Sequence, residues 1–175
     1  MAASIGRAYV TVFRKLRVRV FFSGDELVQP GEPLHPGGIY NSNRFMVRSI
    51  LQLLGCEVTD LGSVPDRLEA TKRAFEHAAE TSDVILTTGG MSVGEEDHIK
   101  PAVEALGRID LWRVKLKPGK PLAFGEVKDV PFVGLPGNPV SGFVVLLMMA
   151  RPFLLRRMGL KEVDLTPMKI RADFD

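Results

Sequence analysis

The feature that most constrains the fold of this chain is a short apolar run, Val84-Ile85-Leu86, that leads directly into Thr87-Thr88-Gly89-Gly90. An uninterrupted aliphatic run is typical of a strand covered on both faces by helices, which is how strands lie in a parallel sheet. Segments with helical spacing of apolar residues flank this run in the sequence. We therefore expect an α/β sheet with residues 84–88 as its central strand.

Strands and helices alternate along the rest of the chain. Residues 17–22 and 57–61 predict strands, and a helix begins at Asn41 to Asn43 and ends at Gly55. Asp66 followed by Glu69 has the pattern of a capping box at the next helix start. The further expected elements are a helix over 98–106, strands over 109–114, 122–124 and 130–135, and a long helix over 139–159. A last strand is expected over 168–170, with nothing to pair with in this chain. This order predicts an α/β fold with a three-layer, doubly wound, mostly parallel sheet.

The composition excludes several function classes. The chain has 175 residues, enough for one α/β domain, and 23 basic against 21 acidic residues leave a net charge of only +2. This charge gives no reason to expect a nucleic acid partner. The longest apolar stretch, Val140 to Met149, is too short to cross a bilayer of about 30 Å, so we expect no membrane partner. The single Cys56 and the basic, strand-like start of the chain suit a cytoplasmic protein.

Three turns that follow expected strands carry the residues of a candidate anion and metal site. The first ends in the acidic run 95–97, and carboxylates at a strand end are suited to Mg²⁺. The second presents two ammonium groups, Lys117 and Lys120. The third places Asn138 and Pro139 at a helix start, where backbone N–H groups are unpaired. Because loops at the carboxyl ends of strands share one crevice in a doubly wound sheet, we expect the three turns to meet.

Two other motifs fit the first turn poorly. Gly90-Met91-Ser92-Val93-Gly94 matches the G-x-S-x-G elbow of the α/β-hydrolases. A hydrolase needs an acid and then a histidine well downstream of its serine, whereas the only later histidine here, His98, follows Ser92 by six residues. The turn also lacks the Lys-Ser or Lys-Thr pair of a P-loop. We therefore expect neither serine hydrolysis nor ATPase-type binding.

Four motifs, in their order along the chain, resemble the molybdopterin molybdenumtransferase family, which includes MoeA and the gephyrin E region. They are Ser23-Gly24-Asp25-Glu26-Leu27, Thr88-Gly89-Gly90-Met91-Ser92-Val93-Gly94-Glu95-Glu96-Asp97, Lys115-Leu116-Lys117-Pro118-Gly119-Lys120-Pro121 and Gly134-Leu135-Pro136-Gly137-Asn138-Pro139-Val140-Ser141. The related adenylyltransferases, MogA and the gephyrin G region, usually have Thr-Gly where this chain has Met91-Ser92. The resemblance runs from about Arg17 to Gly159 and favours the central, MogA-like domain of the molybdenumtransferase branch.

The resemblance implies an activity and a set of site residues. The implied reaction inserts molybdate into the dithiolene of adenylylated molybdopterin and releases AMP, with help from a divalent cation such as Mg²⁺. The implied metal ligands are Asp97, Glu26 and Asp25, and Lys117 and Lys120 would hold the molybdate, so that the implied catalytic residues are Asp97, Glu26, Lys117 and Lys120. The implied cofactor-binding residues are Gly89, Gly90, Ser92, Gly94, Pro121, Pro136, Asn138 and Pro139.

The resemblance also implies a domain organisation. Residues 1–16 would be a stub of a preceding domain, 17–160 the α/β molybdopterin-binding domain and 161–175 the start of a C-terminal β domain. Family members complete the site with those domains and with a second subunit. We therefore expect little activity from the isolated chain, a homodimer for the full-length protein, and a MogA-like adenylyltransferase as a further partner. Two alternatives stay open: a MogA-like molybdopterin adenylyltransferase, and a non-enzymatic scaffold module of the gephyrin kind.

Overall fold

The chain forms a three-layer α/β domain, seen in a computed structural model that describes residues 3–91, 97–171 and 173. The strands of its main sheet are β1 (Arg17–Ser23), β4 (Glu57–Val64), β5 (Val84–Thr88), β6 (Gly107–Trp112), β7 (Ala123–Val127) and β8 (Val130–Leu135). They lie in the order β4-β1-β5-β8-β7-β6. The expected central position of residues 84–88 is thereby confirmed, because β5 lies between β1 and β8.

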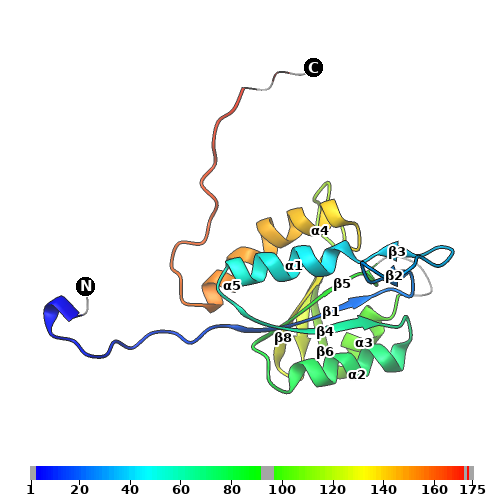
Figure 1. Cartoon of the computed structure of the whole chain (residues 1–175), viewed down its shortest axis with the longest axis horizontal. Coiled ribbons are helices and arrows are strands. Elements are labelled where there is room, and N and C mark those ends of the chain that lie inside the picture. Colours follow the sequence, from blue (N-terminus) through cyan, green and yellow to red (C-terminus); the bar gives the residue numbers. More distant parts are fainter. Residues whose placement is uncertain (1–2, 92–96, 172, 174–175) are drawn as a thin grey trace.

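Helices cover both faces of the sheet. They are α1 (Ser42–Leu53), α2 (Leu68–Ala79), α3 (Ile99–Leu106), α4 (Pro139–Val145), the π-helical segment η2 (Leu146–Ala150) and α5 (Arg151–Arg157). In Figure 1, α1, α4 and α5 lie on one face of the sheet, and α2 and α3 lie on the other. The expected α/β class and layer arrangement are confirmed.

The side chains of β5 alternate between the two layers. Val84 and Leu86 belong to the apolar cluster beneath α1 and the α4 to α5 run, whereas Ile85 belongs to the cluster beneath α2 and α3. All five residues of β5 are buried, which explains why residues 84–86 are apolar without interruption. Parallel pairing joins β5 to β1 and to β8, and β1 to β4. The carboxyl ends of these strands therefore lie at one edge of the sheet.

The other end of the sheet is antiparallel. β7 pairs antiparallel with both β8 and β6, so the sheet is mixed but mostly follows the expected parallel pattern in its centre. Lys128 and Asp129 form the two-residue turn between β7 and β8, with φ of 48° and 64°. Two consecutive left-handed residues are typical of a tight hairpin turn whose twist matches that of the flanking strands.

The long helix expected over 139–159 forms as one run, Pro139–Arg157, with a π-helical turn in its middle. Val145, Leu146 and Leu154 are fully buried against the sheet. By length and composition alone this run could cross a membrane, and it is the one helix of the described chain that meets those criteria, with 33% of it buried inside the domain. Core helices of globular domains meet the same criteria.

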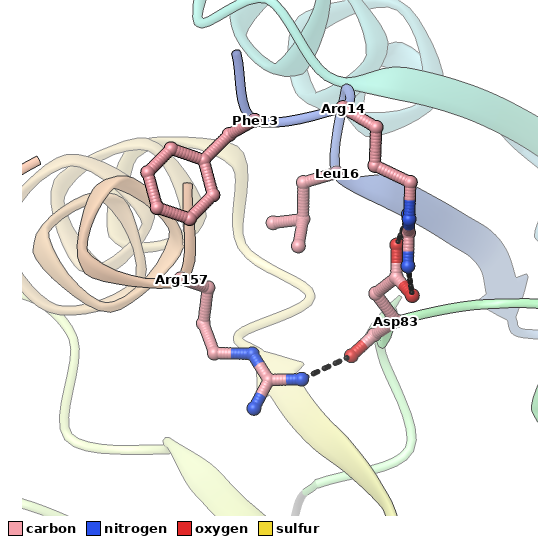
Figure 2. Close-up of a pocket in the computed structure, with 5 residues that line it drawn as sticks. All are labelled: Phe13, Arg14, Leu16, Asp83 and Arg157. Carbon is pink, nitrogen blue, oxygen red and sulfur yellow. Dashed lines mark hydrogen bonds and ion pairs between the residues drawn. The ribbon is translucent and has the colours of Figure 1, made fainter. Parts of the chain in front are cut away.

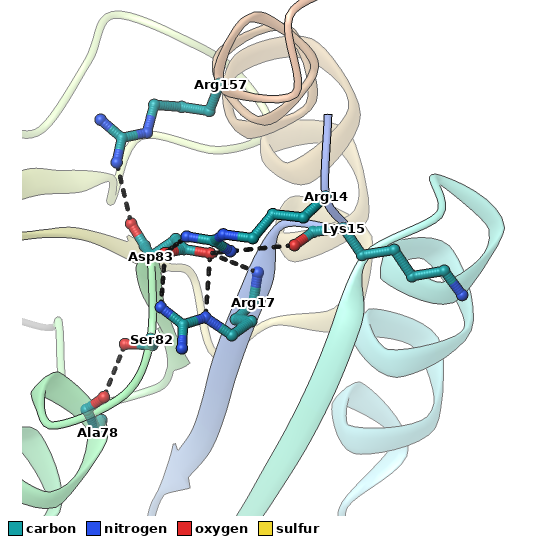
Figure 3. A network of polar contacts seen from close by, with 7 residues as sticks. All are labelled: Arg14, Lys15, Arg17, Ala78, Ser82, Asp83 and Arg157. Atoms are coloured by element: carbon teal, nitrogen blue, oxygen red, sulfur yellow. Dashed lines mark hydrogen bonds and ion pairs between the residues drawn. The ribbon is translucent and has the colours of Figure 1, made fainter. Parts of the chain in front are cut away.

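A polar network closes the amino-terminal edge of the sheet. The carboxylate of Asp83, directly before β5, accepts hydrogen bonds from the Arg14 guanidinium at 2.5 and 2.6 Å and from the Arg17 backbone N–H at 2.8 Å. Arg157 at the end of α5 donates to the Asp83 carbonyl at 3.4 Å (Figure 3). Arg14, Asp83 and Arg157, with Phe13 and Leu16 beside them, surround a cavity of about 180 Å³ (Figure 2). The network holds the start of β1, the start of β5 and the end of α5 together.

Two sequence expectations are wrong. Asp66 does not cap α2, since the N-cap is Arg67 and makes no side-chain hydrogen bond there. The Asp66 carboxylate instead accepts hydrogen bonds from the Ser23 hydroxyl at 2.8 Å and the Asp25 backbone N–H at 3.1 Å, and these long-range donors outcompete the local one. Residues 168–170 form no strand, because they lie in an exposed terminal segment without a neighbouring strand to pair with.

Candidate functional site

A cavity of about 350 Å³ opens at the carboxyl-terminal edge of the sheet, where β5 and β8 end. Its walls come from four separate segments of the chain. The residues that line it are Glu26, Gly89, Gly90, Met91, Pro121, Pro136, Gly137, Asn138 and Ser141. The cavity therefore lies where a doubly wound sheet places its ligand site.

The Gly89-Gly90 turn after β5 needs glycine at both positions. Gly89 has φ of +84°, and a Cβ there would overlap the carbonyl oxygen of Ser23. Gly90 has φ of +59°, and a Cβ would lie 2.7 Å from Cγ1 of Ile99. The turn thus lets the backbone of β5 pass close to β1 and α3 while leaving its own surface open to the cavity.

Glu26 brings a carboxylate to the cavity from the loop after β1. Its Oε2 lies 2.5 Å from where a Cβ on Gly24 would stand, so the side chain folds back over this glycine. The backbone is held by the Ile39 N–H, which donates to the Glu26 carbonyl at 2.8 Å beside the small parallel pair β2 (Leu27–Val28) and β3 (Ile39–Tyr40). The loop that carries the Glu26 carboxylate is thereby fixed by a backbone hydrogen bond.

Asp25, the neighbouring acid, has a different role. Its Oδ1 accepts a hydrogen bond from the Asp66 backbone N–H at 3.1 Å, and the Asp25 N–H donates to the Asp66 carboxylate at the same distance. Asp25 is absent from the described lining of the cavity. Asp25 and Asp66 thus tie the loop after β1 to the segment before α2, and sequence reasoning missed Asp66 because its spacing to Glu69 matched a helix cap.

Asp97 carries a carboxylate oxygen that is not satisfied by the described protein. Its Oδ1 accepts a hydrogen bond from the Ile99 N–H at 3.3 Å, whereas Oδ2 is buried without a partner among the described residues. Burial raises the pKa of Asp97 to about 6, and the backbone N–H groups of Ile99 and Lys100 oppose this rise in part. A buried carboxylate oxygen with a free lone pair is suited to a cation or to a proton.

The two lysines of the second turn stand in solvent. Lys117 and Lys120 are exposed, and neither forms an ion pair within the described part of the chain. The turn is anchored by the Val114 N–H, which donates to the Lys120 carbonyl at 3.0 Å, and by Gly119, which is buried against Val145 with φ of +120°. Pro121, the residue after Lys120, lines the cavity. The turn therefore continues into the cavity wall at Pro121, and its two exposed lysines are absent from the described lining.

The third turn supplies the wall opposite the glycine pair. Asn138 caps α4 by accepting the Ser141 N–H at 3.0 Å, and Pro139 occupies the first helical turn as expected. The side chain of Asn43 in α1 donates to the Gly137 carbonyl at 2.7 Å, a contact that no sequence pattern indicated. The turn is thus fixed both from within and from a neighbouring helix.

The structure brings together part of the predicted site. Six predicted residues line the cavity: Glu26, Gly89, Gly90, Pro121, Pro136 and Asn138. Asp25, Asp97, Lys117, Lys120 and Pro139 are absent from its described lining. Ser92 and Gly94 lie outside the described residues. Among the residues that are described, no group of three or more His, Cys, Asp or Glu side chains is placed to hold a metal.

Comparison with known proteins identifies relatives over nearly the whole domain. Residues 19–156 match a family model described as "Probable molybdopterin binding domain". A molybdopterin molybdenumtransferase from Haemophilus influenzae is 44% identical over 162 residues, covering 93% of this chain and 40% of the relative. The molybdenum cofactor synthesis protein cinnamon from Drosophila melanogaster is 37% identical over 153 residues, covering 87% of this chain and 25% of that protein.

A solved structure agrees with the fold. The molybdopterin biosynthesis MoeA protein from Pyrococcus horikoshii superposes with a TM-score of 0.80 at 34% identity, covering 90% of this chain and 39% of that one. In each of these three comparisons the chain spans two fifths of the relative's length or less.

Proposed function

The chain belongs to the family of molybdopterin-binding domains, and we propose that it acts as the central domain of a molybdopterin molybdenumtransferase. In this proposal, the cavity at the ends of β5 and β8 binds adenylylated molybdopterin, molybdate is inserted into its dithiolene, and AMP leaves. Because the chain spans only part of its relatives, the reaction belongs to the complete polypeptide. We expect the isolated chain to turn over little, since positioning of both reactants needs regions that the relatives have beyond the matched domain.

The observation that carries the proposal is the convergence of distant motifs on one cavity. Glu26, the Gly89-Gly90 turn, Pro121 and the turn 136–138 are far apart in the sequence, yet they line the same 350 Å³ space. This volume lies within the range of small-molecule sites, about 300–1,000 Å³. The glycines keep one wall free of side chains, which suits close approach of a phosphate or pterin to the backbone.

Asp97 and Glu26 fit a divalent cation such as Mg²⁺. The Oδ2 of Asp97, which has no partner among the described residues, is an available oxygen ligand, and Glu26 supplies a carboxylate from the lining of the cavity. Mg²⁺ is commonly held by one or two carboxylates plus substrate phosphate oxygens, so three clustered protein ligands are not required. When bound, such a cation would neutralise charge on the phosphate. Asp25 fits this role less well, because its Oδ1 is already occupied by the Asp66 N–H.

Lys117 and Lys120 would attract the molybdate dianion. Both ammonium groups are exposed and lack an ion-pair partner in the described chain, so their charge is available to an incoming oxyanion. Their neighbour Pro121 on the cavity wall sets where that anion would approach. We further propose a cytoplasmic protein that acts as a homodimer and receives its substrate from a MogA-like adenylyltransferase.

The substitution Asp97→Asn in the complete polypeptide tests this function. Asparagine keeps the shape and the hydrogen bond from Ile99 but removes the charge, so AMP release on addition of molybdate and Mg²⁺ should fall on the order of 100-fold or more. Asp110→Asn, at an exposed ion pair on β6, is the matched control and should leave the rate unchanged. A normal rate in the Asp97→Asn protein contradicts the assignment.

The same assay separates the alternatives. A molybdenumtransferase releases AMP from adenylylated molybdopterin only when molybdate is present. A MogA-like adenylyltransferase instead consumes ATP and releases pyrophosphate, and a scaffold module does neither. Absence of molybdate-dependent AMP release from the unaltered complete protein would therefore refute the proposal.

A further inference from the structure

Asn43 joins two segments that lie 94 residues apart. It stands in the first turn of α1, is only 7% exposed, and donates from Nδ2 to the Gly137 carbonyl at 2.7 Å. Its neighbour in the sequence, Asn41, has the ordinary role of a helix N-cap and accepts the Arg44 N–H at 3.1 Å. The Asn43 side chain therefore serves the turn before α4 and not its own helix.

The other half of the Asn43 amide is unsatisfied. Its Oδ1 is buried and has no hydrogen-bond partner in the part of the chain that the structure describes. A buried acceptor without a donor destabilises a folded protein. The surroundings are otherwise close-packed, since a Cβ on Gly142 would lie 3.1 Å from the Pro136 carbonyl oxygen and 3.9 Å from the Asn43 Oδ1. An apolar side chain would avoid the cost of a buried acceptor without a donor. The function of Asn43 therefore lies in its Nδ2 group, which donates to the Gly137 carbonyl.

The carbonyl that Asn43 holds belongs to the cavity wall. Gly137 lines the cavity together with Pro136 and Asn138, and a Cβ on Gly137 would lie 3.5 Å from the Gly89 Cα. The bond thus sets how closely the third turn approaches the glycine turn. We propose that Asn43 is a positioning residue that sets the width of the candidate site through the Gly137 carbonyl. The part of this proposal that concerns ligand binding rests on the proposed function.

Asn43→Asp tests the proposal because an aspartate at this position can donate a hydrogen bond only when its carboxyl group is protonated. The protonated carboxyl can donate to the Gly137 carbonyl, whereas the ionised carboxylate repels it. Burial beside a carbonyl raises the pKa of such a carboxyl, so the bond should be present at low pH and be lost as pH rises through that pKa. A role in packing alone would give no such dependence, since the two forms have almost the same shape.

Among the residues that the structure describes, few charged groups lie on the elements around Asn43. α4 carries no titratable side chain, and the acid of β4 that contacts α1 is Asp60, which is paired with Arg44 and Arg48. Glu26 faces the shared cavity from the loop after β1. Asp97 titrates near pH 6, so each result is expressed as a ratio to the unaltered chain, in which the contributions of these groups cancel.

The experiment measures the amide NMR signals of Gly137, Asn138 and Ser141 in the chain itself between pH 5 and pH 8. In Asn43→Asp these signals should match those of the unaltered chain at low pH and move away together at high pH. Asn41→Asp is the matched control and should show no such change, because aspartate also serves as an N-cap. Asn43→Ser, whose hydroxyl is too short to reach Gly137, should show the displaced signals at every pH.

Titration with AMP gives a second readout. The Kd for AMP of Asn43→Asp relative to the unaltered chain should be near one at pH 5 and rise about five- to tenfold at pH 8, the effect of losing one hydrogen bond. Unmoved signals in Asn43→Asp or Asn43→Ser overturn the proposal, as do equal movements in Asn41→Asp. Displaced signals with an unchanged Kd ratio also overturn it. Failure of the unaltered chain to bind AMP would count against the proposed function alone, because the signals of the turn need no ligand.

Discussion

Three aspartates of this domain differ in chemistry because different groups reach their carboxylates. Asp97 keeps a buried oxygen without a described partner, and its pKa is raised to about 6, whereas Asp25 uses an oxygen to accept the Asp66 N–H. Asp83, in turn, is held ionised because the Arg14 guanidinium keeps the pKa of that carboxyl well below its usual range, although burial opposes this. Each difference follows from which donors reach the carboxylate.

Asp97→Asn should change how stability depends on pH. The pKa of Asp97 is about 6 in the folded chain against 3.8 for an unperturbed aspartate, so the folded state favours the protonated form. Stability from this group is complete below pH 3.8 and is lost as pH rises through 6. Relative to Asp97→Asn, the unaltered chain should therefore lose on the order of 1–2 kcal/mol of unfolding free energy between pH 4 and pH 7. Urea unfolding at both pH values measures this, and a constant difference would contradict it.

Gly89→Ala should strongly destabilise the domain. The new Cβ would overlap the Ser23 carbonyl oxygen at a positive φ, so we expect a loss of about 3 kcal/mol or more in unfolding free energy. Gly31→Ala is the matched control, since Gly31 also has positive φ but open space around it, and it should cost only about 1–2 kcal/mol. Equal losses in urea unfolding would show that the close approach to Ser23 does not matter.

At the scale of elements, local patterns predicted well where one face of an element is buried. α1 begins at its Asn41 cap and ends before Gly55, whose φ is +87°, as its apolar spacing indicated. α2 follows its expected apolar face but begins without a side-chain cap, because Asp66 is engaged by Ser23 and Asp25. The first turn of α2 therefore receives no hydrogen bond from its N-cap side chain, and a suitable residue at that position would supply one.

Arg67→Ser should stabilise the domain through α2. Arg67 is the N-cap with extended φ and ψ of −139° and 133°, a conformation in which a serine hydroxyl can accept a backbone N–H of the first turn. We expect a gain of about 0.5–1.5 kcal/mol in unfolding free energy. Arg73→Ser, in the middle of the same helix, controls for loss of the charge and should not stabilise. A lower melting temperature for Arg67→Ser would argue against an open cap.

Over the whole molecule, the two ends of the strands carry different groups of residues. The carboxyl ends of the strands carry the candidate site, and the amino ends carry the Asp83 network that joins the entering segment to the end of α5 (Figures 2 and 3). A Cβ on Gly159 would lie 2.6 Å from the Phe13 ring, so an apolar contact supports the same junction. The segments that continue from the domain at both ends therefore leave from one corner.

Arg14→Gln should release the segment that precedes β1 without unfolding the sheet. It removes the paired bonds to the Asp83 carboxylate but leaves the Arg17 contacts in place. Trypsin cleavage after Lys15 should become about threefold faster. Arg108→Gln is the matched control, since its side chain is also 64% exposed and ion-paired, but at β6. Equal cleavage rates in the Arg14→Gln and unaltered chains would show that the Arg14–Asp83 pair does not hold the segment.

The sequence by itself determined the class of fold, the central strand and the family. These follow from local signals: the apolar period of each helix, the uninterrupted run 84–86, and glycine and proline at fixed offsets in the turns. It also selected six residues that line the cavity, because loops at the carboxyl ends of parallel strands must share one edge.

Only the tertiary structure decided how the polar side chains of those loops pair with one another. Asp66 turned from a helix cap into a partner of Ser23 and Asp25, Asn43 reached Gly137 from another helix, and Lys117 and Lys120 stayed in solvent beside the cavity wall. The contacts of Asp66 and Asn43 depend on donors and acceptors that lie tens of residues away in the sequence. A local pattern records what a residue can bind, whereas packing determines which partner comes within hydrogen-bonding distance.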